Sequence, residues 1–231
     1  MAGGAGRGRP RRDAVYLADV LCAVAPVRAR DAWQRRHSEM AGVGTVGRPM
    51  RAAVPLHDAG GKARPPWPPD SAVCAVFSEC RQYRYQLREI WDASKPLVLW
   101  VLMNPSVACT DHADPTLRKT GTFARAWGYG GQLIGNVHAY RATDKRRLLA
   151  MADPVGPTND RLILEMAAEV TTIVLAYGQP PKALRARGAA VVALLRDHPG
   201  LCHLRLSQDG TPVHPLYLPS TLRPTPHHVN P

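Results

Sequence analysis

Residues 97–106 read LVLWVLMNPS, an unbroken apolar run that leads directly into a polar segment. Lys95-Pro96 precedes the run, and Asn104-Pro105 ends it. An apolar run of this length between turn-forming residues is typical of a strand buried on both faces. Open α/β sheets bind their ligands beyond the carboxyl ends of such strands, so we first expect a site at the segment that starts with Asn104.

The composition narrows the class of protein. The 231 residues suffice for one domain of ordinary size with additional segments. Lys and Arg number 30 against 18 Asp and Glu, and the resulting net charge of +12 favours nucleic acid or phosphate partners, although arginine-rich codon usage explains the basic N-terminal part equally well. The five cysteines form no CxxC pair, so we expect no disulfide framework, no metal site and no cofactor, in a reduced, cytoplasmic setting. No apolar run approaches the roughly 20 residues of a membrane span.

The chain divides into three parts by composition. Residues 1–70 are rich in Gly, Ala, Arg and Pro, and we expect a basic, largely disordered extension, in which 14–36 could form one amphipathic helix. Residues 71–219 carry the regular apolar patterns of a single α/β domain. Residues 220–231 read as a disordered tail.

Apolar patterns and turn signals predict the elements of the domain. Strands are expected over 72–77, 83–91, 97–102, 132–137, 172–176 and 201–206. Helices are expected over 115–127, 144–151, 159–170 and 180–198. The first two strands suggest an antiparallel pair, and the other four alternate with helices. We therefore predict a three-layer α/β/α fold with a mainly parallel four-stranded central sheet plus the N-terminal antiparallel pair.

Polar residues follow each of the four core strands. Asn104 follows the first and Asn136 ends the second, Tyr177 and Gly178 follow the third, and His214 lies in the loop after the fourth. Because the carboxyl ends of parallel strands face one edge of a sheet, these residues can converge on one crevice.

Each of these residues also has a purely structural interpretation. Asn104-Pro105 could be a simple turn, Asn136 a bridge between strands, and His214 a surface histidine. Tyr83, Arg84 and Tyr85 suggest a base stacked beside a cation, but strand aromatics more often belong to a core.

Other chemistries find little support in the motifs. There is no GxSxG, HExxH or Walker motif. Asp111, His112 and Asp114 could bind a metal ion, but Asp114 before Pro115 is better explained as a helix N-cap.

Six motifs together resemble the bacterial and phage family called domain of unknown function 1643. In chain order they are YRYQLREIW, VLMNPSVA, DPTLRKTGTFARAWGYGG, NVHAYRATD, DPVGPTNDR and PVHPLYLP. The resemblance covers about residues 71–219 and implies that the first 70 residues are an extension.

A more distant resemblance is to the uracil-DNA glycosylase superfamily, and it implies a uracil-DNA-glycosylase-like fold. Asn104-Pro105, Asn136 and His214-Pro215 occupy the places of that superfamily's motifs. The resemblance implies that Asn104 orients the attacking water and that Asn136 hydrogen-bonds the edge of an extruded base. It also implies that His214 stabilises charge on the leaving base.

An extruded base would also need an aromatic floor, for which the resemblance suggests Tyr140, Tyr177 or Phe123. The further candidates for substrate contact are Ser106, Arg141 and Gly178. Ser106 and Leu216 differ from the residues of the glycosylase motifs at their places.

Three functions follow as hypotheses. The first is a nucleobase-binding domain that cleaves or processes an N-glycosidic bond in DNA or in a nucleoside or nucleotide. The second is a non-catalytic nucleic-acid or partner-binding module, with Arg84 and Arg118 as nucleic-acid contacts. The third is an enzyme acting on an unrelated small metabolite.

Overall fold

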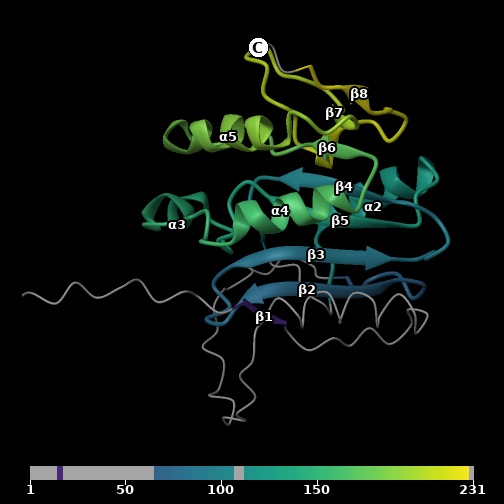
Figure 1. The fold of residues 1–231 in the computed structure, drawn as a ribbon, viewed down its shortest axis with the longest axis horizontal. Coiled ribbons are helices and arrows are strands. Elements are labelled where there is room, and N and C mark those ends of the chain that lie inside the picture. Colours follow the sequence, from purple (N-terminus) through teal and green to yellow (C-terminus); the bar gives the residue numbers. More distant parts are fainter. Residues whose placement is uncertain (1–14, 18–64, 107–111, 229–231) are drawn as a thin grey trace, which may run out of the picture.

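The structure, a computed structural model, describes residues 15–17, 65–106 and 112–228, and its strands form one sheet in the order β1-β2-β3-β5-β4-β6-β7-β8 (Figure 1). The strands are β1 (Val15–Leu17), β2 (Ala72–Ser78), β3 (Arg84–Ile90), β4 (Leu97–Leu102), β5 (Gly131–Asn136), β6 (Ile173–Leu175), β7 (Leu201–His203) and β8 (Thr225–Pro226). The helices are α2 (Pro115–Ala126), α3 (Lys145–Ala150), α4 (Asn159–Ala168) and α5 (Arg185–Leu195), with the short 3₁₀ helices η1 (Lys182–Leu184) and η2 (Pro215–Tyr217).

The centre of the sheet is parallel. β4 pairs with β5 on one side and with β6 on the other, and β6 pairs with β7. β3 runs antiparallel to β5, and β2 runs antiparallel to β3. The structure therefore confirms a mixed α/β fold in which four parallel strands adjoin an N-terminal antiparallel pair.

Helices cover both faces of this sheet. Trp100 of β4 packs against Phe123 of α2, with 6.0 Å between the ring centroids. The next residue along the strand, Leu99, lies in a second core with Ile163 of α4 and Val191 of α5, and Figure 1 places α4 and α5 over the same side of the sheet. Successive residues of a strand point to opposite faces, so β4 is buried on both, as its unbroken apolar run predicts.

The helix boundaries confirm the capping signals of the sequence. The Asp114 carboxylate accepts a hydrogen bond from the Leu117 N–H at 2.9 Å and caps α2, with Pro115 at the first helical position. Gly128, just after this helix, has a φ of +89°, the left-handed conformation that favours glycine. Asp144 caps α3 in the same way as Asp114 caps α2.

The N-terminal prediction needs correction. Val15–Leu17, expected within one helix over 14–36, pairs as a strand with β2, whereas residues 18–64 lie outside the described residues. Asp70, assigned to the extension, contacts the domain, because its carboxylate accepts a hydrogen bond from Arg125 at 2.8 Å. Long-range strand pairing and ion pairing have decided these positions, and neither leaves a local signal.

The expectation of a disordered C-terminal tail over 220–231 also differs from the structure. β8 pairs antiparallel with β7, and the Trp127 indole donates a hydrogen bond to the Leu222 carbonyl at 3.0 Å. Polar and Pro-rich composition suggested disorder, but backbone pairing and the half-buried side chain of Leu222 fix this segment. Throughout the described ranges, every helix is too short or too polar to span a bilayer.

Candidate functional site

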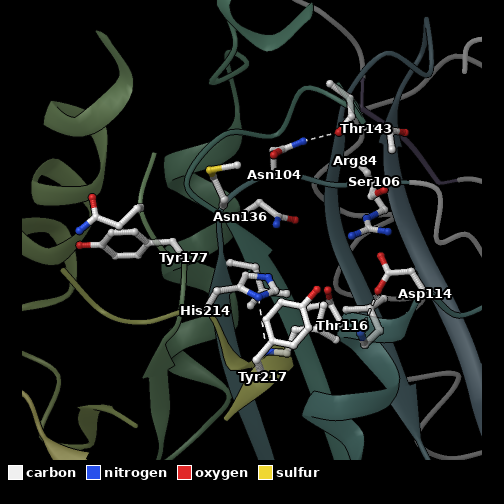
Figure 2. A pocket seen from close by; sticks show the side chains of 17 residues that line it. Arg84, Asn104, Ser106, Asp114, Thr116, Asn136, Thr143, Tyr177, His214 and Tyr217 are labelled. Atoms are coloured by element: carbon white, nitrogen blue, oxygen red, sulfur yellow. Dashed lines mark hydrogen bonds between the residues drawn. The ribbon is translucent and has the colours of Figure 1, made fainter. Parts of the chain in front are cut away.

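A cavity of about 440 Å³ opens where the parallel strands β4, β5 and β6 end (Figure 2). Asn104 follows β4, Asn136 ends β5, and Tyr177 and Gly178 follow β6; His214 reaches the same cavity from the loop before η2. The structure therefore brings these five residues to one cavity, and their chemical roles stay predictions.

Arg84 and Ser106 line the cavity as well. Arg84 starts β3, which runs antiparallel to β5, and its N–H donates to the Ala139 carbonyl at 2.9 Å, just beyond the end of β5. The sequence analysis proposed Arg84 as a nucleic-acid contact, but Arg84 is only 2% exposed. Arg88 on the same strand is also buried and pairs with Glu169 at 2.5 Å.

Asn136 is the least expected group in the cavity. Its residue is 1% exposed, and neither Nδ2 nor Oδ1 of its side chain has a hydrogen-bond partner among the described residues. Its backbone is held firmly, because Asn159 Nδ2 donates to the Asn136 carbonyl at 2.9 Å. A buried polar group without a partner costs about 1–3 kcal/mol. A ligand or an ordered water that supplies the missing partner offsets this cost.

The Asn104 amide is oriented by the protein. Its Nδ2 donates to the Ala142 carbonyl at 2.7 Å and to the Pro105 carbonyl at 3.1 Å. Both amide protons are thus used within the chain, and Oδ1 is the atom through which Asn104 can accept a hydrogen bond from a ligand or a water molecule. Asn104 therefore both closes the turn after β4 and presents an acceptor.

His214 is held in one orientation from two sides. Its Nδ1 accepts a hydrogen bond from the Leu216 N–H at 3.4 Å, so the neutral ring carries its proton on Nε2. Gly178 has a φ of +68°, and a Cβ atom there would lie 2.9 Å from the Cβ of His214. Gly178 thus serves the site by allowing the His214 loop to approach, through its lack of a side chain.

None of the three proposed floor residues presents its ring as expected. Figure 2 shows the Tyr177 ring directed away from the cavity, and it packs against Gly188 of α5. Burial, and to a smaller extent Asp209, raise the pKa of the Tyr177 hydroxyl. Phe123 belongs to the core beneath α2, and Tyr140 stacks edge-on against Tyr83 outside the cavity.

Two predicted contacts also lie elsewhere. Arg141 does not line the cavity: its Nη1 donates to the Arg81 carbonyl at 3.2 Å and its guanidinium lies over the Phe77 ring. Arg118 is exposed on α2 and lines a separate cavity of about 220 Å³ beside Glu89. Each of the two arginines is next in sequence to a residue that lines the cavity. Successive side chains of a helix or a turn point in different directions, so the arginines themselves do not line it.

The cavity includes residues that the sequence analysis missed. These are Thr116, Thr143, Gln179 and Tyr217, together with Asp114, for which the helix cap was preferred to a metal-binding role. Asp114 is the one carboxylate among the described lining residues. Because Asp114 directly follows the loop after a core strand, the sequence could have suggested that it lines a ligand site as well as capping the helix. Nowhere in the described ranges do three His, Cys, Asp or Glu side chains gather into a metal-binding group.

A buried histidine lies two residues beyond Asn136. His138 is 1% exposed, and burial, with a smaller contribution from the charge of Arg187, lowers its pKa to about 4. Arg187 Nε also donates to the Val137 carbonyl at 2.8 Å, so this cation supports the backbone between the two residues. The imidazole is therefore neutral at physiological pH.

Comparison with known proteins gives one family. No curated protein and no solved structure matches the chain, so the likeness to uracil-DNA glycosylases is not shown. A family model described as "Protein of unknown function (DUF1643)" matches residues 84–216. This span covers more than half of the chain and every cavity-lining residue discussed above except Tyr217. The chain therefore belongs to the DUF1643 family.

Proposed function

We propose that this cavity binds a nucleobase and that the site hydrolyses the N-glycosidic bond between that base and its sugar, in DNA or in a free nucleoside or nucleotide. The observation that carries the proposal is the Asn136 side chain. Its amide offers a donor and an acceptor side by side, buried and without a partner among the described residues. A nucleobase edge offers the complementary donor and acceptor.

The proposed reaction uses the neighbouring groups in separate roles. Water attacks the anomeric carbon, the carbon–nitrogen bond breaks with its electron pair leaving on the base, and the proton lost by the water ends on the base nitrogen. Asn104 Oδ1 orients the water, and the Asp114 carboxylate takes up its proton during attack and then returns it through solvent to the base nitrogen. The Nε2–H of His214 stabilises the negative charge on the leaving base.

The fixed positions of these three groups in the structure support the proposed roles. The three groups are positioned by the chain itself: Asn104 by the Ala142 carbonyl, His214 by the Leu216 N–H and Asp114 by the Leu117 N–H. Polar groups that are fixed before the substrate binds need no reorganisation during the reaction, which is the main source of electrostatic catalysis.

The test measures base release from DNA containing uracil, hypoxanthine or modified bases, and from free nucleosides. We expect release by the wild-type protein, and we expect Asn136→Ala to weaken binding of the released base about tenfold or more, because a two-bond contact to a base is lost. Gln208→Ala, which removes an exposed amide outside the cavity, is the matched control and should bind normally.

Loss of binding in Asn136→Ala would not reflect lost internal hydrogen bonds, because this amide makes none with the described residues. A thermal melt of each variant checks this point. If no substrate releases a base and Asn136→Ala binds every tested base as the wild type does, the proposal is wrong.

A further inference from the structure

Tyr217 is an exposed aromatic residue at a cavity whose other described lining residues are buried or half-buried, apart from Gln179. It is 91% exposed, yet it lines the cavity together with His214 and Thr116 (Figure 2). A residue so placed borders the cavity while its side chain is almost wholly in solvent. It can therefore contact a group that remains outside when another group has entered.

The exposure of Tyr217 is imposed by its backbone. Tyr217 ends η2, whose first residue, Pro215, is buried, and the following residue, Leu218, is in the core. The Leu218 N–H donates to the Pro215 carbonyl at 3.1 Å and closes the turn. The chain on both sides of the ring is thus anchored, and an aromatic side chain with only two rotatable bonds loses little entropy on stacking.

A cation lies close to the same segment. Lys119 of α2 donates through Nζ to the Ser220 hydroxyl at 2.7 Å, three residues beyond Tyr217. Arg118, next to it on the helix, is exposed but lines the separate cavity beside Glu89, so Lys119 is the cation beside this segment. Aromatic faces flanked by basic side chains are the usual arrangement for binding a strand of nucleic acid, because bases stack and phosphates pair with the cations.

We propose that the substrate is a nucleic-acid strand with an unpaired target base, rather than a free nucleoside, and that the base next to the target stacks on Tyr217. This inference rests on the proposed function, because it assumes that the target base occupies the cavity beside Asn136. It adds a second contact outside the cavity, which a nucleoside cannot make. The strand then crosses the cavity mouth along η2 and the start of α2.

The experiment compares short single-stranded oligonucleotides with the corresponding nucleosides, for uracil, hypoxanthine and the normal bases, as ligands in a direct binding titration. Tyr217→Ala should weaken oligonucleotide binding about tenfold more than nucleoside binding, because one base–aromatic stack is lost. Tyr217→Phe keeps the ring and should bind like the wild type. The wild-type affinity for oligonucleotide should also fall as salt rises.

The outcomes separate the two proposals. Suppose that Asn136→Ala weakens binding of both ligands. If Tyr217→Ala then weakens binding of oligonucleotide and nucleoside equally, or leaves oligonucleotide binding unchanged, the stacking proposal is overturned and nucleobase binding stands. Preference of the wild-type protein for nucleosides would also overturn it. If Asn136→Ala changes neither ligand's affinity, both proposals fail.

Discussion

At the scale of single residues, the region around the end of β5 contains both partnered and unpartnered buried polar groups. Asn159 uses its amide to hold the Asn136 carbonyl, whereas the Asn136 amide itself has no partner among the described residues. His138 is kept neutral, with a pKa lowered to about 4 chiefly by burial. Burial thus leaves the Asn136 amide without a partner among the described residues and makes His138 a source of acid sensitivity.

The His138 pKa predicts how stability depends on pH. In the unfolded chain this imidazole takes up a proton near its ordinary pKa of 6.5, whereas in the folded protein it does so only near 4. Its contribution is therefore fully present above about pH 6.5 and is lost as pH falls towards 4. The loss should reach about 3 kcal/mol in the free energy of unfolding, measured by urea denaturation. His138→Gln should remove this part of the dependence, and an unchanged pH profile in the variant would refute the assignment.

At the scale of elements, two helices begin with the same capping residue but in different surroundings. Asp114 caps α2 and lines the cavity, whereas Asp144 caps α3 and does not. The two helix starts therefore allow capping to be separated from a role in the reaction.

We predict that Asp114→Ala lowers the free energy of unfolding by about 1 kcal/mol, the usual value of an N-cap, and that Asp144→Ala also lowers it. Only Asp114→Ala should also reduce base release, because only its carboxylate reaches the cavity. Urea denaturation and the base-release assay measure the two effects. Equal loss of base release in both variants would mean that helix capping alone explains Asp114.

At the scale of the whole molecule, the C-terminal segment holds together parts that are far apart in sequence. Leu222 packs against the core on the α2 side and its carbonyl accepts the Trp127 indole N–H, while the His227 N–H donates to the Leu201 carbonyl at 2.9 Å. The segment thus joins α2 to the far edge of the sheet.

Ending the chain after Pro219 should lower the free energy of unfolding by about 2–4 kcal/mol, because one apolar side chain and several hydrogen bonds are lost. The urea midpoint of the shortened chain measures this effect. Gln208→Ala, an exposed residue outside this segment, is the control and should leave the midpoint unchanged. A shortened chain as stable as the whole one would show that β8 contributes no stability.

The sequence by itself determined the features of the fold that depend on interactions between residues close together in the chain. The apolar run of β4 predicted a doubly buried strand, Asp114-Pro115 predicted the start of α2, and the order of the core strands placed Asn104 and Asn136 at one edge. Period, capping and turn signals act over a few residues, and the parallel direction follows from the chain order of strands and helices.

Only the tertiary structure decided what depends on contacts between distant residues. The pairing of β3 with β5 brought Arg84 to the cavity, the packing of α5 turned the Tyr177 ring away from it, and anchored η2 exposed the Tyr217 ring beside it. Which strand pairs with which, and which side a side chain faces after a strand ends, is set by the free energy of long-range packing. That free energy belongs to the assembled fold and leaves no pattern in any single stretch of sequence.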